Sequence, residues 1–393
     1  MRNRKIRLAL VAGAVAAAVI TAMAVPAGAG PTILTGNQNS LAGVGSDTSY
    51  FMMEGISPQY NVNTTKNTDH DFVTQVPPLN TAPFPAGTFV ADDAVVAGSY
   101  TWSSATTTGG ACGGGNTPPN GSSAGISCLN ADTIGQVDFA RSSRGPKTGE
   151  TSTLDFWAYA IGAVDWVKFP GSHAPSSLTP SQLINIYTCD PNTHAPFASD
   201  WSQVGGTAGP IKKYAPQTSS GTYSFFNSNV LNGNTVDANC DAAHSSTFLE
   251  EHDARGVTSA NFPNAIYAFD YGKWTAQSKG FEANLRNQST FGAINGVTPT
   301  ASTVNEAGTF VDSRYIFNVV RKAAHPGSYT NQYKDVLKFA GVQITSNGGA
   351  GFICNGLASQ AISLAGFVAL PLAATGGTGL PNSRCRLNPT PIP

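Results

Sequence analysis

The chain has few charged side chains. Of its 393 residues, 22 are Lys or Arg and 23 are Asp or Glu, which is 11% of the sequence, and the formal net charge is −1. Beyond the first seven residues no run of basic residues occurs. The composition therefore argues against a nucleic-acid-binding or anionic-membrane surface, and it leaves any anion site to local dipoles and a few arginines.

Motifs for metal and dithiol chemistry are also missing. The six histidines are scattered, with no H-E-x-x-H motif and no pair at i, i+4, and no C-x-x-C occurs. The sequence thus predicts neither a zinc site nor redox chemistry, and we expect no cofactor. Glycine and proline are plentiful instead, with 42 and 25 residues, which is typical of a loop-rich extracellular protein.

Residues 1–29 have the pattern of an export signal. A basic start, "MRNRKIR", precedes the apolar stretch "LALVAGAVAAAVITAMAV", and "AGA" at 27–29 offers small residues for cleavage. This segment holds four basic and no acidic residues, so the remainder has 18 basic and 23 acidic residues and a net charge near −5. We expect a secreted or envelope protein without a lipid-anchor cysteine, an uncleaved membrane anchor being the alternative.

All six cysteines follow the export segment. An even number in an exported chain predicts three disulfides, and pairing neighbours closes the shortest loops, although the sequence alone allows other connectivities. The predicted pairs are Cys112–Cys128, Cys189–Cys240 and Cys354–Cys385.

Strand and helix patterns alternate along the rest of the chain. Its length exceeds what one hydrophobic core usually holds, so we expect two lobes. The apolar run 156–171 predicts a buried strand, and 178–190 predicts a helix that starts with a Thr cap and a Pro. Residues 210–216, 264–274 and 314–320 read as strands, and 333–342 as a helix. The pattern predicts an α/β fold, in which ligands bind beyond the carboxyl ends of strands.

Three polar turns share one design. "GVGSDTSYFM" (43–52), "NGSSAGIS" (120–127) and "QTSSGTYSFF" (217–226) each combine glycine with hydroxyl residues ahead of a predicted helix. Such turns present N–H and O–H donors that suit an oxyanion, although an ordinary Ser/Thr helix cap is the alternative for each. The arginines of "FARSSRGP" (139–146), Arg141 and Arg144, are candidates for the positive charge or else belong to a solvated strand end.

Two further patterns allow other interpretations. "GSSAG" (121–125) matches the G-x-S-x-G nucleophile elbow with Ser123 as nucleophile, but the prolines of "NTPPN" precede it where the elbow needs a strand. The charged stretch "EEHDARG" (250–256) offers Asp253 to a ligand, or else is a solvated helix end.

In order, "GVGSDT", "GSSAGI", "VDFARSS", "YAIGAVDWV", "LTPSQLINIY" and "SSGTYSFF" resemble the phosphate-binding proteins of bacterial ABC importers, most of all the secreted or envelope variety of actinobacteria. The resemblance runs from about residue 41 to about residue 345. It implies a type II periplasmic-binding-protein fold with two α/β lobes, two hinge crossings and an oxyanion clamped without a metal. On this basis we expect lobe 1 to comprise 30–163 and 308–393, and lobe 2 to comprise 164–307.

Matching positions supply the expected ligand residues. Together with the flanking hydroxyls and arginines, the expected set is Asp47, Thr48, Ser122, Ser123, Arg141, Ser142, Ser143, Arg144, Ser219, Ser220, Gly221 and Thr222. Ser143 stands where the family has an acidic acceptor for the proton of hydrogen phosphate, and Pro216 and Thr218 stand where it has an arginine and an aspartate.

The sequence thus predicts a monomeric, non-enzymatic, extracytoplasmic solute-binding protein. Its expected ligand is a small oxyanion, phosphate first, captured between two lobes for ABC-type uptake, with an ABC permease as partner and no nucleic acid. The alternatives are a secreted binding protein of the same fold for an organophosphate, a sugar or a protein, and a hydrolase or phosphatase that uses Ser123.

Overall fold

The structure is a computed structural model that describes residues 40–61, 73–75, 119, 121–131, 137–322, 336–341, 350–372 and 383–393. The predicted export segment and Cys112 lie outside these ranges. None of the helices within them has the length and apolar character needed to span a bilayer.

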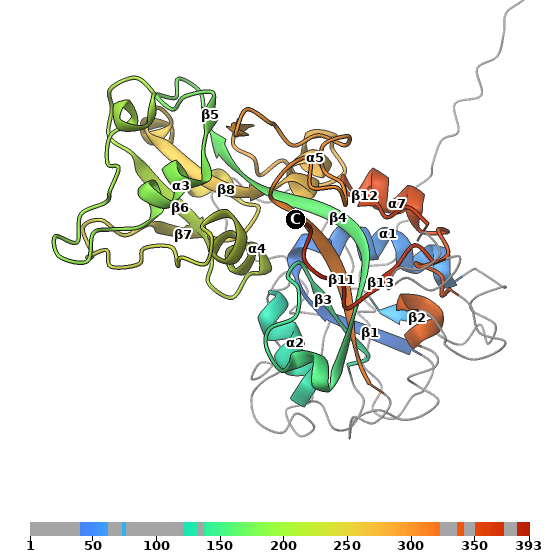
Figure 1. The fold of residues 1–393 in the computed structure, drawn as a ribbon. Coiled ribbons are helices and arrows are strands. Elements are labelled where there is room, and N and C mark those ends of the chain that lie inside the picture. Colours follow the sequence, from blue (N-terminus) through green and yellow to red (C-terminus); the bar gives the residue numbers. More distant parts are fainter. Residues whose placement is uncertain are drawn as a thin grey trace, which may run out of the picture.

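Two lobes form the molecule, joined by long central strands (Figure 1). The strands are β1 Ser40–Gly45, β2 Val73–Gln75, β3 Phe139–Ser142, β4 Leu154–Lys168, β5 Ser177–Leu178, β6 Lys212–Pro216, β7 Thr247–Leu249, β8 Ala265–Asp270, β9 Thr290–Phe291, β10 Ala293–Ile294, β11 Ser313–Arg321, β12 Val368–Ala369 and β13 Arg386–Leu387. The helices are α1 Tyr50–Asn61, α2 Ser122–Ala131, α3 Pro180–Tyr187, α4 Gly221–Phe225, α5 Tyr271–Ser278 and α7 Ser359–Leu364, with a π-turn Phe226–Val230 after α4. Short 3₁₀ turns are η1 Asp47–Ser49, η2 Glu150–Ser152, η3 Trp201–Val204, η5 Ala254–Gly256 and η6 Ser259–Asn261.

The strand β4 links the two lobes. It pairs with β11 from Leu154 to Ala163 and with β8 from Val164 to Val167, in both cases antiparallel. Its two faces are both covered, because Phe156 belongs to one buried cluster and the adjacent Trp157 to another. This burial explains the uninterrupted apolar run and confirms the predicted strand. The expected division of the chain at 163/164 and 307/308 stays a prediction.

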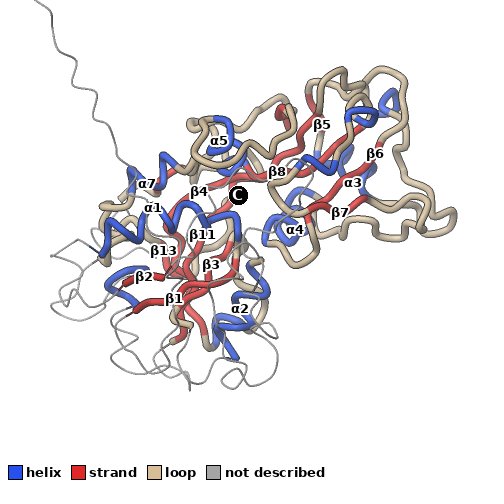
Figure 2. The backbone as a smooth tube through the Cα atoms, turned by 180° about the vertical axis from the view of Figure 1, so that it is seen from behind, coloured by secondary structure: helices blue, strands red, loops and turns tan. Residues whose placement is uncertain are grey.

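The sheet order β2-β1-β3-β11-β4-β8-β6-β7 sets the strand directions. Since β3 is antiparallel to β11, β11 to β4 and β4 to β8, β3 runs along β4 and β8 runs against it. The strand β1 is parallel to β3, and β6 and β7 follow β8. The carboxyl ends of β1 and β3 therefore point at lobe 2, and those of β6, β7 and β8 point at lobe 1. Figure 2 shows β1 and β3 in one lobe and β6 and β7 in the other.

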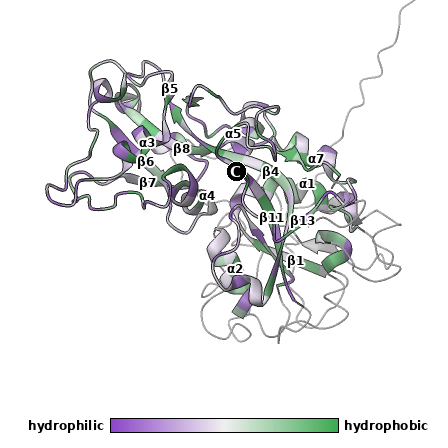
Figure 3. Ribbon diagram, viewed as in Figure 1, coloured by the Kyte–Doolittle hydropathy of each residue, from purple (hydrophilic) through white to green (hydrophobic). Residues whose placement is uncertain are grey.

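Most predicted helix starts are confirmed. Thr179 caps α3 in a capping box with Gln182, and Pro180 is its first residue. Residues 336–340 are helical, within the predicted 333–342. The three polar turns run directly into η1, α2 and α4. Outside these elements the long connections of lobe 2 are largely hydrophilic (Figure 3).

One strand prediction is wrong in its second half. The predicted strand 264–274 ends at Asp270, and Tyr271 begins α5. The reason is a cap, because the Asp270 carboxylate accepts a hydrogen bond from the Lys273 amide at 3.0 Å and so starts the helix.

Two of the predicted disulfides are confirmed. Cys189 pairs with Cys240, and Cys354 pairs with Cys385. Cys128 is also disulfide-bonded, and its predicted partner Cys112 lies outside the described residues.

Candidate functional site

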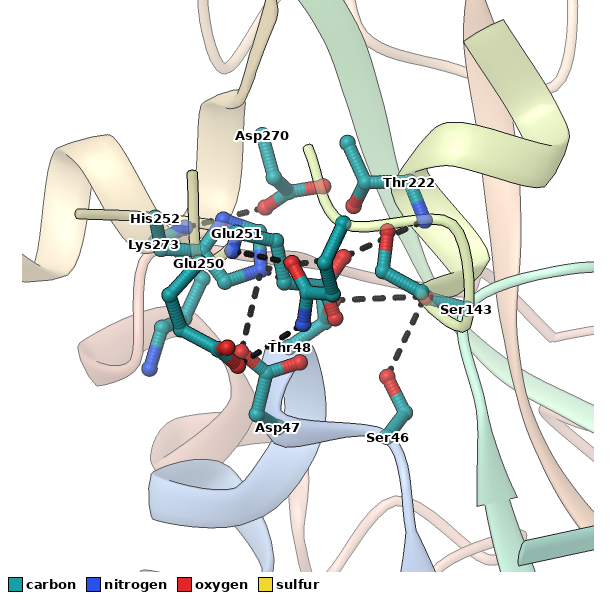
Figure 4. A network of polar contacts seen from close by, with 12 residues as sticks. Ser46, Asp47, Thr48, Ser143, Thr222, Glu250, Glu251, His252, Asp270 and Lys273 are labelled. Atoms are coloured by element: carbon teal, nitrogen blue, oxygen red, sulfur yellow. Dashed lines mark hydrogen bonds and ion pairs between the residues drawn. The ribbon is translucent and has the colours of Figure 1, made fainter. Parts of the chain in front are cut away.

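Hydroxyl groups converge at the carboxyl ends of β1 and β3. The Ser143 hydroxyl lies 3.1 Å from that of Ser46, 3.2 Å from that of Thr48 and 3.3 Å from that of Ser122 (Figure 4). The Ser143 amide also donates to Ser122 Oγ at 3.0 Å. All four side chains are at most 1% exposed. Residues that follow β1, follow β3 and begin α2 therefore form one buried cluster, which we call the hydroxyl cluster.

The turn before α4 brings lobe 2 against this cluster. A Cβ on Gly221 would collide with the hydroxyls of Ser122 and Ser143, so only glycine permits the observed approach. Ser220 caps α4 through the Tyr223 amide at 2.9 Å. Thr222 is fully buried, and its backbone N–H donates to the Glu251 carboxylate at 3.2 Å (Figure 4).

A buried arginine from β11 reaches the same turn. Arg314 Nη2 donates to Thr222 Oγ1 at 2.9 Å and to Asp270 Oδ2 at 2.7 Å. Arg314 is 2% exposed, and its Nε and Nη1 have no hydrogen-bond partner among the described residues. An arginine remains protonated in proteins, so two N–H-bearing nitrogens of a buried cation lack acceptors.

The segment after β7 contributes an acid and a histidine. Glu251 accepts hydrogen bonds from the Thr222 amide at 3.2 Å and from Thr48 Oγ1 at 3.4 Å. The Nε2 atom of His252 lies 3.0 Å from Thr48 Oγ1 and 3.9 Å from Asp47 Oδ2. The solvated helix end that the charged stretch 250–256 allows is wrong for Glu251 and His252, because both are 2% exposed.

Burial and neighbouring groups act in opposite directions on the two titratable side chains of this segment. Burial raises the pKa of Glu251, but a hydrogen bond with Asp47, the adjacent His252, the bond from Thr222 and the charge of Arg314 together lower it to about 2. Burial, which outweighs the attraction of Glu251, lowers the pKa of His252 to about 3. Glu251 is therefore ionised and His252 neutral at neutral pH.

Asp47, Glu251 and His252 also have the composition of a metal site. Each offers one ligand atom, and these atoms lie within 4.8 Å of one another. The Thr222 amide donates to Glu251, and the positive charge of Arg314 acts on the same carboxylate. Donors and positive charge favour an anion over a cation at this position.

Arg141, an expected ligand residue, holds the turn after β1. Its Nε, Nη1 and Nη2 donate to the carbonyl oxygens of Ser46, Gly43 and Gly45 at 3.1, 2.9 and 3.3 Å. The arginine thereby orients the segment that carries Thr48.

Arg144 and two of the expected hydroxyls form a separate group. Arg144 makes a two-point ion pair with Glu150 at 2.8 Å for both bonds, and its Nε donates to Ser123 Oγ at 3.1 Å. Ser142 Oγ bonds locally to the Arg144 backbone. The nucleophile elbow considered for Ser123 needs a strand directly before it. Pro119, the described residue that precedes Gly121, is not in a strand.

Of the remaining expected residues, Thr48, Ser122 and Ser143 belong to the hydroxyl cluster, and Gly221 and Thr222 lie against it. Asp47 lies beside His252, Ser220 caps α4, and Ser219 is exposed. The expectations missed four contributors, namely Ser46, Glu251, His252 and Arg314. A signal existed for two of them, because "EEHDARG" is a dense charged stretch in a chain that has few charges. Arg314 had none, since it lies within an apolar strand.

The architecture and the position of the cluster define a two-lobed, periplasmic-binding-protein-like α/β fold. Among solved structures, an ABC-type phosphate transport receptor from Vibrio cholerae matches at a TM-score of 0.51 and 17% identity, covering 84% of this chain and all of that one. PstS from Borrelia burgdorferi matches at a TM-score of 0.46 and 15% identity, covering 85% and 99%. No protein-family model and no curated protein sequence matches the chain.

Proposed function

We propose that the protein captures a small oxyanion, phosphate first, between its two lobes for uptake by an ABC importer. The observation that carries the proposal is Arg314, a buried guanidinium whose Nε and Nη1 have no acceptor among the described residues. Its third nitrogen, Nη2, bonds to Thr222 beside the hydroxyl cluster. An oxyanion there gives these N–H groups acceptors and offsets the buried charge.

Neutral donors supply the rest of the proposed site. The hydroxyls of Ser46, Thr48, Ser122 and Ser143 and the amide of Thr222 come from both lobes. Neutral donors hold a desolvated anion when each of its oxygens receives hydrogen bonds. Arg141 and the Arg144–Glu150 pair belong to the frame of the site in this proposal.

Phosphate and an importer are proposed from similarity. The sequence resemblance and the name of the phosphate transport receptor from Vibrio cholerae, which has this fold, support phosphate as the ligand and an ABC permease as the partner. The predicted export segment supports an extracytoplasmic location. The division into lobes at 163/164 and 307/308 belongs to the same proposal, with hinge closure burying the ligand.

Calorimetric titration of the purified protein with phosphate, sulfate and a phosphate monoester tests the proposal. Thr222→Val keeps the side-chain volume but removes the hydroxyl that accepts from Arg314. We expect phosphate to bind and the variant to lose at least roughly tenfold in affinity, the worth of a charged hydrogen bond. Thr188→Val is the matched control, because Thr188 is also buried but lies at the carboxyl end of α3, away from the hydroxyl cluster. We expect its phosphate affinity to equal that of the wild type. Absence of heat with all three oxyanions would falsify the proposal.

A further inference from the structure

A side chain of the protein itself already occupies donors of the proposed oxyanion site. Glu251 Oε2 accepts from the Thr222 amide at 3.2 Å, and Oε1 accepts from the Thr48 hydroxyl at 3.4 Å (Figure 4). These two donors come from opposite lobes. A carboxylate thus joins the lobes in the way that the proposed function assigns to the ligand.

The backbone on both sides of Glu251 is anchored. Gln217 accepts a hydrogen bond from the Glu251 amide and donates to the Glu250 carboxylate at 2.7 Å. Gln277 Nε2 donates to the carbonyl of His252 at 2.9 Å. These contacts come from the residue after β6 and from α5, and they fix the main chain so that the Glu251 carboxylate lies at the hydroxyl cluster. The carboxylate can leave the cluster by rotation about the side-chain torsions of Glu251.

The charge of this carboxylate makes it a competitor for an anion. Glu251 is ionised at neutral pH, as its lowered pKa indicates, and the neutral His252 beside it adds no positive charge. Two unscreened anions repel strongly in a buried site. The carboxylate and a fully ionised oxyanion therefore cannot share the amide of Thr222 and the hydroxyl of Thr48.

We propose that Glu251 is the resident ligand of this site, an internal carboxylate that an incoming oxyanion displaces from Thr48 and Thr222. The inference rests on the proposed function. Its consequence is that the measured binding free energy is the free energy of binding the oxyanion minus that of the contacts that Glu251 makes with Thr48 and Thr222. A second consequence is that the lobes close on Glu251 before any ligand arrives.

Removal of the internal carboxylate tests the competition. In calorimetric titrations with phosphate at neutral pH, we expect Glu251→Ala and Glu251→Gln to bind at least tenfold more tightly than the wild type. Glu306→Gln is the control, because it removes one negative charge from an ion pair with Arg386 that lies outside the cluster, and we expect no change. Equal or weaker binding by the Glu251 variants overturns the inference and makes the carboxylate part of the frame or a direct partner of the ligand.

A second measurement does not depend on phosphate. Formate is a free carboxylate that fits the space left by Glu251→Ala, so we expect formate to raise the melting temperature of this variant with increasing concentration and not that of the wild type, relative to chloride at equal ionic strength. No response of the variant overturns the inference. Stabilisation by formate with no phosphate binding to either protein supports Glu251 as the resident ligand and contradicts phosphate capture. Phosphate binding that is equally tight in the wild type and in Glu251→Ala supports phosphate capture and contradicts Glu251 as the resident ligand.

Discussion

Arg314 Nη2 lies 2.7 Å from Asp270 Oδ2, and both side chains are at most 2% exposed. The pair joins the start of β11 to the end of β8, where the two lobes meet. Asp270 also caps α5 through the Lys273 amide, which fixes the carboxylate that holds the guanidinium. Arg314 bonds through Nη2 alone, and its Nε and Nη1 have no partner among the described residues.

Arg314→Lys should weaken oxyanion binding. Lysine keeps the charge but lacks the planar fork of donors, so it cannot bond to Asp270, Thr222 and a ligand in the same geometry. We expect a loss of roughly 10- to 100-fold in phosphate affinity, equivalent to about 1.5–3 kcal/mol for a charged hydrogen bond. Titration calorimetry measures this change. Arg255→Lys is the control, since Arg255 pairs with Asp253 at 2.6 Å in a more exposed position, and equal losses in the two variants would remove the special role of Arg314.

Gly221→Ala should hold the lobes apart. The new methyl group would meet the hydroxyls of Ser122 and Ser143, and such overpacking costs about 1–3 kcal/mol. We expect weaker phosphate binding and a larger radius of gyration in solution scattering. Gly55→Ala in α1 is the control, because no atom of the described residues lies within 4 Å of a Cβ there. Scattering profiles that coincide for the two variants would show that the close approach at Gly221 does not govern closure.

Asp312 should make the protein less stable as the pH rises. Burial raises the pKa of its carboxyl to about 7, above its value in the unfolded chain. The native state therefore retains a proton that the unfolded state loses between about pH 4 and pH 7, so this contribution is present below pH 4 and disappears as the pH passes 7. The effect reaches at most about 4 kcal/mol.

Urea unfolding at pH 5 and pH 8 measures that dependence. We expect Asp312→Asn to reduce the fall in unfolding free energy between the two pH values, with the greater gain at pH 8. Asp190→Asn is the control, because backbone amides of Asn192 and Thr193 lower the pKa of Asp190. Its titration therefore affects the unfolding free energy below pH 5, outside the measured range. Parallel pH profiles for the wild type and Asp312→Asn would contradict the prediction.

The disulfide Cys189–Cys240 should stabilise lobe 2. It closes a stretch with a sequence separation of 51, and a loop of that length restricts the unfolded chain by about 4 kcal/mol in the chain-entropy model. We expect the double replacement by Ala to lower the melting temperature measured by calorimetry under oxidising conditions. A melting temperature within experimental error of the wild type would argue that the crosslink is replaced by packing.

Local patterns explain why much of the fold could be predicted. The apolar run of β4 and the Thr179–Pro180 start of α3 depend on neighbouring residues, and both are found where the sequence indicates. The failure at 264–274 has the same origin, since the cap formed by Asp270 turns an apolar strand into a helix within one residue. A strand pattern alone does not reveal such a cap.

The site could be predicted only in part. Thr48, Ser143 and Thr222 were expected to meet, because their turns follow strands or open helices. Arg141 and Arg144 are equally good candidates by sequence, yet Arg141 bonds to backbone carbonyls of the turn after β1 and Arg144 bonds to Glu150. Whether an arginine side chain points at the hydroxyl cluster depends on how its strand is oriented in the sheet. The neighbouring strands set that orientation, and the local sequence does not reveal it.

The sequence by itself determined the long strand β4, the start of α3 and the pairing of Cys189 with Cys240 and of Cys354 with Cys385, because each follows from residues close together or from the shortest available loops. Only the tertiary structure brought Arg314 and Glu251 to the hydroxyl cluster. They lie at the start of β11 and beyond the end of β7, and the antiparallel passage of β4 between the lobes turns those two ends toward β1 and β3.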